Sequence, residues 1–176
     1  MNNIKNLKLS LTLTLLMACV GHAFAQGGFG GVTAKVESIS GSSLMTFGGG
    51  GAWMPTENFY LGGGGYGSMN TININDRVLE SFGYGGLMAG YKLPIIDKLS
   101  LSIQGLLGSG GYVWDGQSDR FQLIEPSIHL WFRVNHFMAI NIGGQYRWSF
   151  MDANSPLSAE DLSAGGVQFS LIFGAF

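Results

Sequence analysis

The stretch Phe121–Phe150, FQLIEPSIHLWFRVNHFMAINIGGQYRWSF, decides the fold, because apolar and polar residues alternate along both of its halves. Apart from one glycine, apolar side chains occupy the even positions over Ile128–Val134 and again over Met138–Trp148. A period of two over about ten residues indicates a β-strand with one apolar face, whereas an amphipathic helix repeats about every 3.6 residues. Asn135-His136, between the two halves, predicts a tight hairpin.

Periodicity alone does not fix which face of such a sheet looks outward. A soluble lipocalin-like barrel keeps its apolar face inside, and a membrane barrel turns that face to the lipid. Only 11% of the 176 residues are charged, about half the usual globular fraction, and 29 are glycine. A soluble barrel needs a charged exterior, so the composition favours the membrane arrangement, with a soluble ligand carrier as an alternative.

Residues 1–25 have the three-part pattern of a secretory signal peptide. The pattern consists of Lys5 and Lys8 in a positive region, an apolar run from Leu9 to Val20, and the cleavage site Ala23-Phe24-Ala25. A run of about a dozen apolar residues is shorter than the roughly 20 that a membrane-spanning helix needs. We therefore expect residues 1–25 to be removed and residues 26–176 to form the folded domain.

Cys19, the only cysteine, ends the stretch Leu16-Met17-Ala18-Cys19, which resembles a bacterial lipobox. Acylation of Cys19 is thus the alternative to cleavage after Ala25. Cleavage after Ala25 leaves no cysteine for a disulfide. It also removes two of the nine Lys and Arg and none of the eleven Asp and Glu, so the net charge becomes 7 − 11 = −4. A net negative charge of this size provides no basic surface of the kind that binds nucleic acid.

Eight alternating segments follow the signal region. They span residues 30–39, 44–54, 59–69, 81–93, 99–114, 121–134, 138–150 and 165–176. Eight is an even number and the smallest common size of a membrane barrel. In hydrocarbon an open sheet edge leaves backbone groups without partners, so the first and last strands must pair. The sequence therefore predicts an all-β fold, an eight-stranded antiparallel up-and-down transmembrane β-barrel.

The connections between these segments differ in length. Those after the second, fourth and sixth segments are short, namely Pro55–Asn58, Pro94–Lys98 and the Asn135 turn. Those after the third, fifth and seventh are longer and more polar, namely Asn70–Glu80, Asp115–Arg120 and Met151–Ala164, although the one after the first, Ser40–Ser42, is short. Membrane barrels have tight periplasmic turns and longer extracellular loops, so we expect the longer connections to face the cell exterior.

Aromatic residues near the predicted strand ends fit the girdles that lie at membrane interfaces. They are Trp53, Phe59, Tyr60, Trp114, Phe121, Phe137, Trp148 and Phe150. Inward packing of so many rings is the less favoured alternative, because an eight-stranded lumen is narrow. The glycine runs Gly48–Gly51 and Gly62–Gly65 lack a following GK[ST], so they are no phosphate loop. We expect them to permit curvature and to leave room for Tyr66 and Tyr84.

Charged and polar residues occupy the predicted inner face of three strands. They are Lys35, Glu37, Glu125, His129, Arg133, Gln145 and Arg147. Unpaired ionisable groups in a narrow lumen cost several kcal/mol each, so we expect an interlocked polar plug. A water-filled path for small solutes is the alternative, disfavoured because side chains fill an eight-stranded interior.

The opening hairpin also predicts a register. A three-residue turn, Asn135–Phe137, places residues whose numbers sum to 272 opposite each other, including Ser127 with Gln145 and His129 with Gly143. Gly143 leaves room for the imidazole ring. The same register predicts an ion pair between Glu125 and Arg147. Pro126 cannot donate to the ladder, and a bulge there would redirect Glu125.

The carboxyl end carries a family resemblance. Gly165–Phe176 alternates in the way of the last strand of bacterial outer-membrane proteins and ends on an aromatic, although Phe176 is out of phase with Val167, Phe169, Leu171 and Phe173. The domain resembles small OmpA/OmpX-like eight-stranded barrels. The resemblance implies the bacterial outer membrane, contact with its lipids, and insertion by the barrel-assembly machinery.

No residue pattern in the chain specifies a catalytic site. A Ser127/His129/Glu125 triad would fit a lipid-modifying barrel enzyme, but a triad is recognised by geometry and not by spacing. HExxH, CxxC and paired-His patterns are absent from the sequence, so we expect no metal and no cofactor. We therefore expect a non-enzymatic barrel with a structural, envelope-integrity or surface-interaction role, with partners reached through its extracellular loops.

Overall fold

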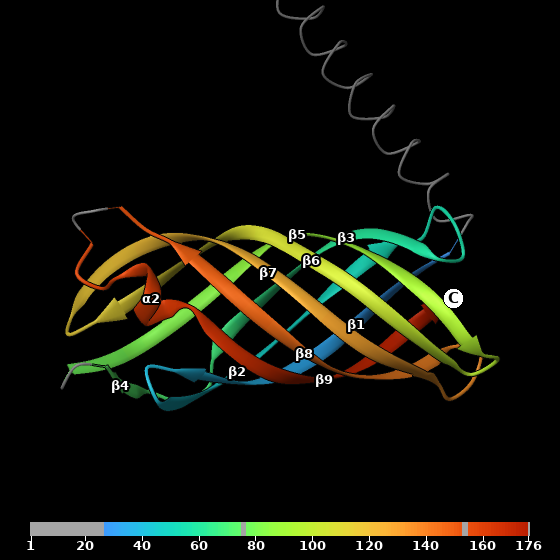
Figure 1. The fold of residues 1–176 in the computed structure, drawn as a ribbon, viewed down its shortest axis with the longest axis horizontal. Coiled ribbons are helices and arrows are strands. Elements are labelled where there is room, and N and C mark those ends of the chain that lie inside the picture. Colours follow the sequence, from blue (N-terminus) through green and yellow to red (C-terminus); the bar gives the residue numbers. More distant parts are fainter. Residues whose placement is uncertain (1–26, 75–76, 153–154, 176) are drawn as a thin grey trace, which may run out of the picture.

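The computed structural model describes residues 27–74, 77–152 and 155–175 and is a closed antiparallel β-barrel (Figure 1). The strands are β1 (Gly28–Ile39), β2 (Ser42–Trp53), β3 (Phe59–Ser68), β4 (Ile72–Ile74), β5 (Arg77–Ile96), β6 (Leu99–Trp114), β7 (Gln117–Arg133), β8 (Met138–Phe150) and β9 (Ala164–Ala175). A short helix, α2 (Ala159–Leu162), precedes β9. The expected signal peptide, Cys19 and Phe176 lie outside the described residues.

The barrel closes through its first and last strands. β1 pairs with β2 on one side and with β9 on the other, from Gly28 opposite Ala175 to Ser38 opposite Gly165. From β9 the order continues through β8, β7, β6 and β5, and β5 pairs with β3. The short β4 pairs only with the start of β5 and extends the wall above β3. The predicted eight-stranded up-and-down barrel is therefore confirmed.

Most strand bounds agree with the sequence, and β6 covers 99–114 as predicted. Two of the predicted loops were wrong. Within Asn70–Glu80, β4 and the start of β5 form a hairpin, and within Asp115–Arg120 the strands continue up to the pair Asp115-Gly116. Both residues of that pair have positive φ, 52° and 74°, as a two-residue hairpin turn of this kind requires. Because these strand extensions are polar in composition, their sequence predicted loops instead of strands.

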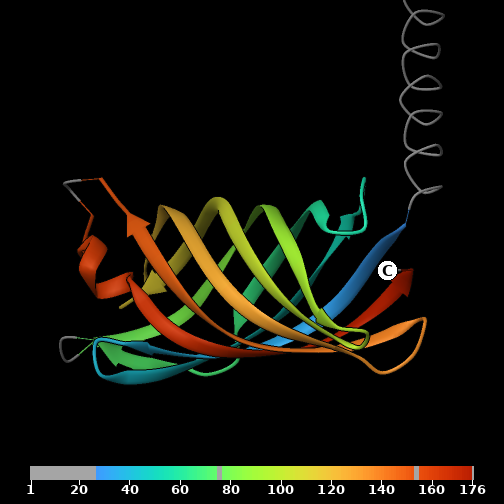
Figure 2. The same cartoon turned by 45° about the vertical axis from the view of Figure 1, so that its right-hand side comes forward.

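The two ends of the barrel differ (Figures 1 and 2). The connections after β2, β5 and β7 lie at one end with Gly28 and Ala175, and we call it the turn end. The turns after β1 and β6, the β4–β5 hairpin and α2 lie at the other, which we call the loop end. Among the described residues no helix is long and apolar enough to cross a membrane.

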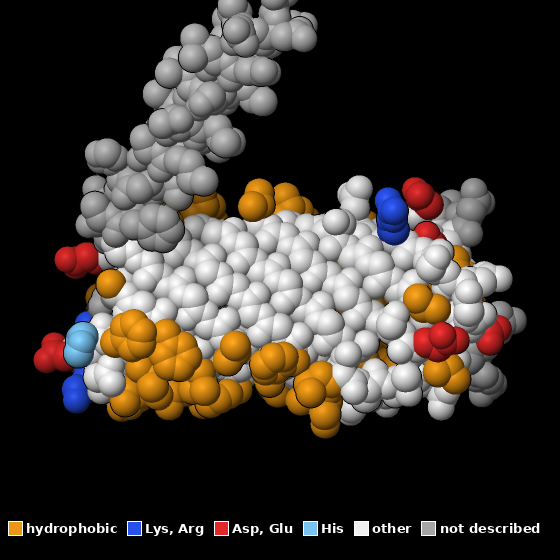
Figure 3. Space-filling view, turned by 180° about the vertical axis from the view of Figure 1, so that it is seen from behind, with side chains coloured by type: hydrophobic (Ala, Val, Ile, Leu, Met, Phe, Trp, Pro, Cys, Tyr) orange, Lys and Arg blue, Asp and Glu red, His pale blue; other side chains and the backbone are white. Residues whose placement is uncertain are grey.

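The outer wall is apolar over much of its length. Outward residues such as Ile128, Leu130 and Ile142 are 51%, 49% and 57% exposed. This is the reverse of a soluble carrier, whose apolar face is inside. Seen from behind, the middle of the wall is largely bare of side chains (Figure 3), where β2, β3 and β5 carry runs of glycine.

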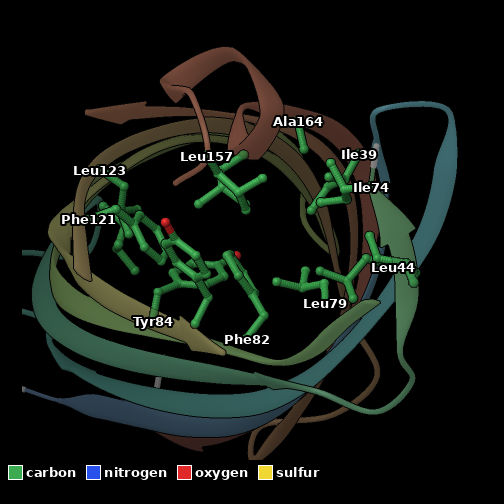
Figure 4. Close-up of a cluster of buried hydrophobic side chains, with 14 of the residues drawn as sticks. Ile39, Leu44, Ile74, Leu79, Phe82, Tyr84, Phe121, Leu123, Leu157 and Ala164 are labelled. Carbon is green, nitrogen blue, oxygen red and sulfur yellow. The ribbon is translucent and has the colours of Figure 1, made fainter. Parts of the chain in front are cut away.

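The loop end encloses a hydrophobic core (Figure 4). Buried apolar side chains from seven strands and from the segment around α2 meet there, among them Ile39, Leu44, Ile74, Leu79, Phe82, Trp114, Phe121, Leu123, Leu157 and Leu162. In Figure 4, Leu157 points into the middle of this ring. Leu157 and Leu162, both from the segment around α2, close the loop end of the lumen.

The prediction of interfacial aromatics was right for some residues and wrong for others. Trp53, Phe59, Phe137, Trp148 and Phe150 are 37–57% exposed on the outer wall. Tyr60, Trp114 and Phe121 are at most 7% exposed and point inward. Glycines make the room for two of them: a Cβ at position 90 would lie 2.2 Å from Tyr60 Cζ, and one at position 110 would lie 2.5 Å from Phe121 Cζ.

We predict that Gly48→Ala destabilises the barrel by about 1–3 kcal/mol, the usual cost of overpacking. A Cβ at position 48 would lie 1.9 Å from the Gly65 carbonyl oxygen on β3, and that backbone cannot move without breaking the β2–β3 ladder. Urea unfolding of the refolded chain in detergent measures the change. Gly105→Ala is the matched control, because a Cβ there meets nothing within 4 Å. Equal destabilisation by both substitutions would contradict the steric explanation.

Candidate functional site

Six of the seven residues predicted for the lumen lie buried inside the barrel. Lys35 and Glu37 come from β1, Glu125 and His129 from β7, and Gln145 and Arg147 from β8. None is more than 6% exposed. Alternation along the three strands aims these side chains at the barrel axis, opposite the outward-facing apolar residues.

Lys35 and Glu125 form the first ion pair, with 2.5 Å between Nζ and Oε1. Tyr84 from β5 joins them: its hydroxyl donates to Glu125 Oε2 at 2.6 Å and accepts from Lys35 Nζ at 3.0 Å. Lys35 Nζ also lies 3.6 Å from the centroid of the Tyr66 ring, a cation–π contact. Both carboxylate oxygens of Glu125 therefore have partners.

Arg147 and Glu37 form the second ion pair, with 2.7 Å between Nη1 and Oε1. The rest of the Arg147 guanidinium turns to the loop end, where Nε and Nη2 each donate to the Leu162 carbonyl oxygen at 3.2 Å. Its carbon lies 4.6 Å and 4.9 Å from the ring centroids of Phe82 and Tyr84. Tyr84 thus touches both ion pairs, and Arg147 ties the lumen to α2.

The predicted β7–β8 register is confirmed, but the ion pair derived from it was wrong. Ser127 lies opposite Gln145 and His129 opposite Gly143, as expected. The ladder is interrupted at Glu125 and Pro126, where proline has no N–H to donate. Glu125 and Arg147 still face the lumen, but each binds a residue of β1 instead of the other.

His129 sits where the register placed it. A Cβ at position 143 would lie 2.2 Å from His129 Cδ2, so glycine there makes room for the ring. The side-chain nitrogen of Gln168 lies 2.8 Å from His129 Nε2, within hydrogen-bonding distance. Ser127 Oγ donates instead to the Gln104 carbonyl oxygen at 3.4 Å. Within the described chain, therefore, Ser127, His129 and Glu125 make no hydrogen bonds to one another, and the triad is not assembled.

Arg133 lies outside this cluster. As the last residue of β7 it is exposed at the turn end, where its Nη2 donates to the Asp97 carbonyl oxygen at 2.5 Å. The lumen cluster sits nearer the loop end, and Trp131, Tyr60 and Phe29 fill the lumen between it and the turn end, with ring centroids 5.1–6.1 Å apart. Alternation predicted which face of β7 carries Arg133, but it did not predict that Arg133 lies at the end of the barrel, outside the buried part of the lumen.

The segment around α2 holds the loop end closed. Ser158 and Asp161 form a capping box that fixes the short helix. Ser149 Oγ donates to the Leu162 carbonyl oxygen at 3.1 Å, next to the Arg147 bonds. A hydrogen bond from the Ser155 side chain lowers the pKa of the Asp119 carboxyl group, aided by the Arg120 backbone N–H. Sequence reasoning missed this closure, because nothing in the spacing shows where a loop folds back.

Groups of three or more His, Cys, Asp or Glu that could hold a metal ion are not found in ranges 27–74, 77–152 and 155–175. What the site can do chemically follows from its composition. Two buried ion pairs neutralise four charges away from water, and Tyr84 contacts one pair through its hydroxyl and the other through its ring, so that four strands of the wall are cross-linked. This arrangement connects β1 with β7 and β8 across the lumen.

Comparison with known proteins supports the architecture. Neither a family model nor a curated protein matches the chain. Among solved structures, the N-terminal β-barrel of Pseudomonas aeruginosa OprF is similar at 8% identity, TM-score 0.61, covering 85% of this chain and 98% of that one. Neisserial surface protein A is similar at 8% identity and TM-score 0.61, covering 84% of this chain and 95% of that one. Ail of Yersinia pestis is similar at 15% identity and TM-score 0.55, covering 84% of this chain and 96% of that one. The chain therefore has the fold of the small eight-stranded outer-membrane barrels.

We predict that Lys35→Met destabilises the barrel by about 3–5 kcal/mol, because it leaves the Glu125 carboxylate buried without a cation. Adding Glu125→Gln to Lys35→Met should recover much of that loss, since the amide is neutral and still offers Tyr84 an oxygen. Urea unfolding of Lys35→Met, of Glu125→Gln, of the double variant and of the parent measures the full cycle. A double variant as unstable as the sum of the two single variants would show that the charges do not act as a pair.

Proposed function

We propose that this protein is an integral outer-membrane β-barrel with a structural, envelope-integrity or surface-interaction role and no catalytic site. The observation that carries the proposal is the combination of an apolar outer wall with a lumen sealed by paired charges. Lipid tails would contact the outer wall, and the fold leaves no unpaired sheet edge in the hydrocarbon. The signal-like residues 1–25 and the alternating last strand support export and insertion by the barrel-assembly machinery.

The interior favours a barrel that does not conduct. Besides the ion pairs, the lumen contains a cavity of about 40 Å³ lined by Thr33, Gln104, Asn141, Gln168 and Ser170 among others. That volume holds about one water molecule. Asn141 Oδ1 has no hydrogen-bond partner within the described chain, and such a water would supply one. The aromatic rings of Phe29, Tyr60 and Trp131 toward one end, and the leucines of the α2 segment at the other, support a blocked axis.

The alternatives are less well supported. A soluble lipocalin-like carrier would need a polar outer wall, and here the outer wall carries the apolar residues. A lipid-modifying enzyme would need reactive groups within hydrogen-bonding reach of one another, and His129 instead binds Gln168. The structural role therefore fits the lumen better than catalysis does.

A surface role depends on the charges of the loop end. A structure of Ail is known in complex with the heparin analogue sucrose octasulfate. In sequence, the segments at the loop end contain Arg77 and Arg120 and the acidic residues Asp76, Glu80, Asp115, Asp119, Asp152, Glu160 and Asp161. These charges sum to 2 − 7 = −5. A sulfated partner is therefore not part of the proposal.

We predict that Ile142→Arg hinders folding into lipid vesicles by about 2–4 kcal/mol, the cost of a cation near the bilayer midplane. Ile142 is 57% exposed on the outer wall, midway along β8. Gln122→Arg is the control, because Gln122 is equally outward but lies beyond the apolar band toward the loop end. Heat-modifiable gel mobility and urea titration in vesicles report the folded fraction. If both variants fold equally well in lipid, the assigned lipid face is wrong.

We predict that the loop end faces the cell exterior. After cleavage following Ala25 the chain has no cysteine, so single substitutions provide unique labels. Ser118→Cys lies at the loop end and Glu57→Cys at the turn end, and both positions are exposed. A membrane-impermeant maleimide added to intact cells should label the first and not the second, while both react after lysis. The opposite pattern would reverse the orientation, and labelling of neither variant on intact cells would also contradict it.

A further inference from the structure

The turn end opens into a vestibule of about 550 Å³ that the lumen cluster does not use. Its floor is Trp131 and Ala139, which are 4% and 1% exposed. Its walls come from the turn after β2, the end of β5, the start of β6 and the end of β7. The vestibule is therefore a blind pocket, closed at its base by the aromatic group of Phe29, Tyr60 and Trp131.

Three cations line this vestibule, Lys92, Lys98 and Arg133, together with two carboxylates, Glu57 and Asp97. The lining charge is 3 − 2 = +1, in a chain whose mature net charge is expected to be −4. Within the described chain, neither Arg133 nor Lys98 forms a salt bridge. The four charges of the lumen, in contrast, are all paired. Because Arg133 and Lys98 have no carboxylate partner among the residues that the structure describes, their charges add positive potential inside this concave site.

Backbone contacts hold these cations in place. The Arg133 N–H donates to the Lys98 carbonyl oxygen at 2.8 Å, and Arg133 Nη2 donates to that of Asp97. The Lys92 N–H donates to the Asn58 carbonyl oxygen at 2.7 Å, which fixes the turn after β2 against β5. Lys92 Nζ lies 5.3 Å from the centroid of the Trp131 ring, over the floor of the vestibule. The Arg133 guanidinium and the Lys92 ammonium group are thus held in place before any ligand arrives.

We propose that this vestibule binds a phosphate group. An arginine fork combined with lysine ammonium groups is the usual protein complement to phosphate oxygens. Ser100 and Asn58, which also line the pocket, add neutral donors. The phosphate comes either from a soluble anion or from the headgroup of a phospholipid. Headgroups reach the rim because Ile95 and Ile96, on the same wall, are 55% and 65% exposed and border the lipid face.

The test uses the full mature chain refolded in a non-ionic, phosphate-free detergent, with the Trp131 indole N–H followed by NMR and assigned with Trp131→Phe. In one arm sodium phosphate is titrated at constant ionic strength against sodium chloride. In the other, phosphatidylglycerol is added to the micelles, with a neutral glycolipid as control. Saturable movement of the indole signal in the phosphate arm indicates a soluble anion, and movement in the lipid arm alone indicates a headgroup. If the indole signal moves in neither arm, the proposal is overturned.

Variants separate a site from a general charge effect. Arg133→Gln should weaken binding about tenfold, the effect of losing one charge-assisted hydrogen bond. Lys98→Gln, in an exposed turn, gives the same reading if Arg133→Gln fails to refold. Glu57→Gln should tighten binding, because it removes a competing carboxylate from the wall. Arg120→Gln at the loop end is the matched control and should change nothing; a loss equal to that of Arg133→Gln overturns the proposal.

The phosphate arm does not depend on the proposed membrane role, because it is carried out in detergent. The lipid arm rests on that role. If the chain fails to insert into vesicles but still binds phosphate in detergent, the proposed function fails and the vestibule proposal stands. If insertion succeeds and neither arm moves the indole signal, the proposed function stands and the vestibule proposal is overturned.

Discussion

The pairing of β1 with β9 is the contact on which the rest of the structure depends. It spans from Gly28 opposite Ala175 to Ser38 opposite Gly165, and it turns an open sheet into a wall without edges. Only a closed wall satisfies the backbone of a sheet surrounded by hydrocarbon. Closure also creates a narrow interior, and every inward side chain must then find its partner within that interior. The lumen network is therefore a consequence of closure and not an independent feature.

The two ion pairs of the lumen join strands that are not neighbours in the sheet, and not the two strands of one hairpin. β1 supplies one partner to each ion pair, Lys35 to Glu125 on β7 and Glu37 to Arg147 on β8. Because β1 is also the strand that closes the wall, these bonds reinforce the closure from inside. Arg147 extends the network to the Leu162 carbonyl oxygen, so the segment that closes the loop end is fastened to the same charges. Loss of one charge would then be felt both in the wall and at the loop end.

Much of this fold could be predicted from the sequence, and the failures share a cause. Alternation gave the strands, their faces and the β7–β8 register, because these are local properties of a pleated chain. It failed for the partner of Glu125, which lies on β1, some 90 positions away in the sequence. It failed for Tyr60 and Phe121, whose room depends on Gly90 and Gly110 on neighbouring strands. Contacts across the lumen depend on closure, and periodicity carries no information about them.

The misjudged loops have a physical explanation in the polarity of the wall. Along β7, Glu125 and His129 face inward with Ile124 and Ile128 outward. Beyond Ile124 the arrangement reverses, since Leu123 and Phe121 are buried while Gln122 is exposed. The barrel thus has the polarity of a membrane protein over most of its length and that of a soluble barrel at the loop end. A strand whose polar face turns outward where it leaves the lipid looks, in sequence, like the start of a loop. In the proposed membrane setting, the reversal marks where the hydrocarbon ends, between Ile124 and Gln122 on β7, and β5, β6 and β7 continue past it around a hydrophobic core.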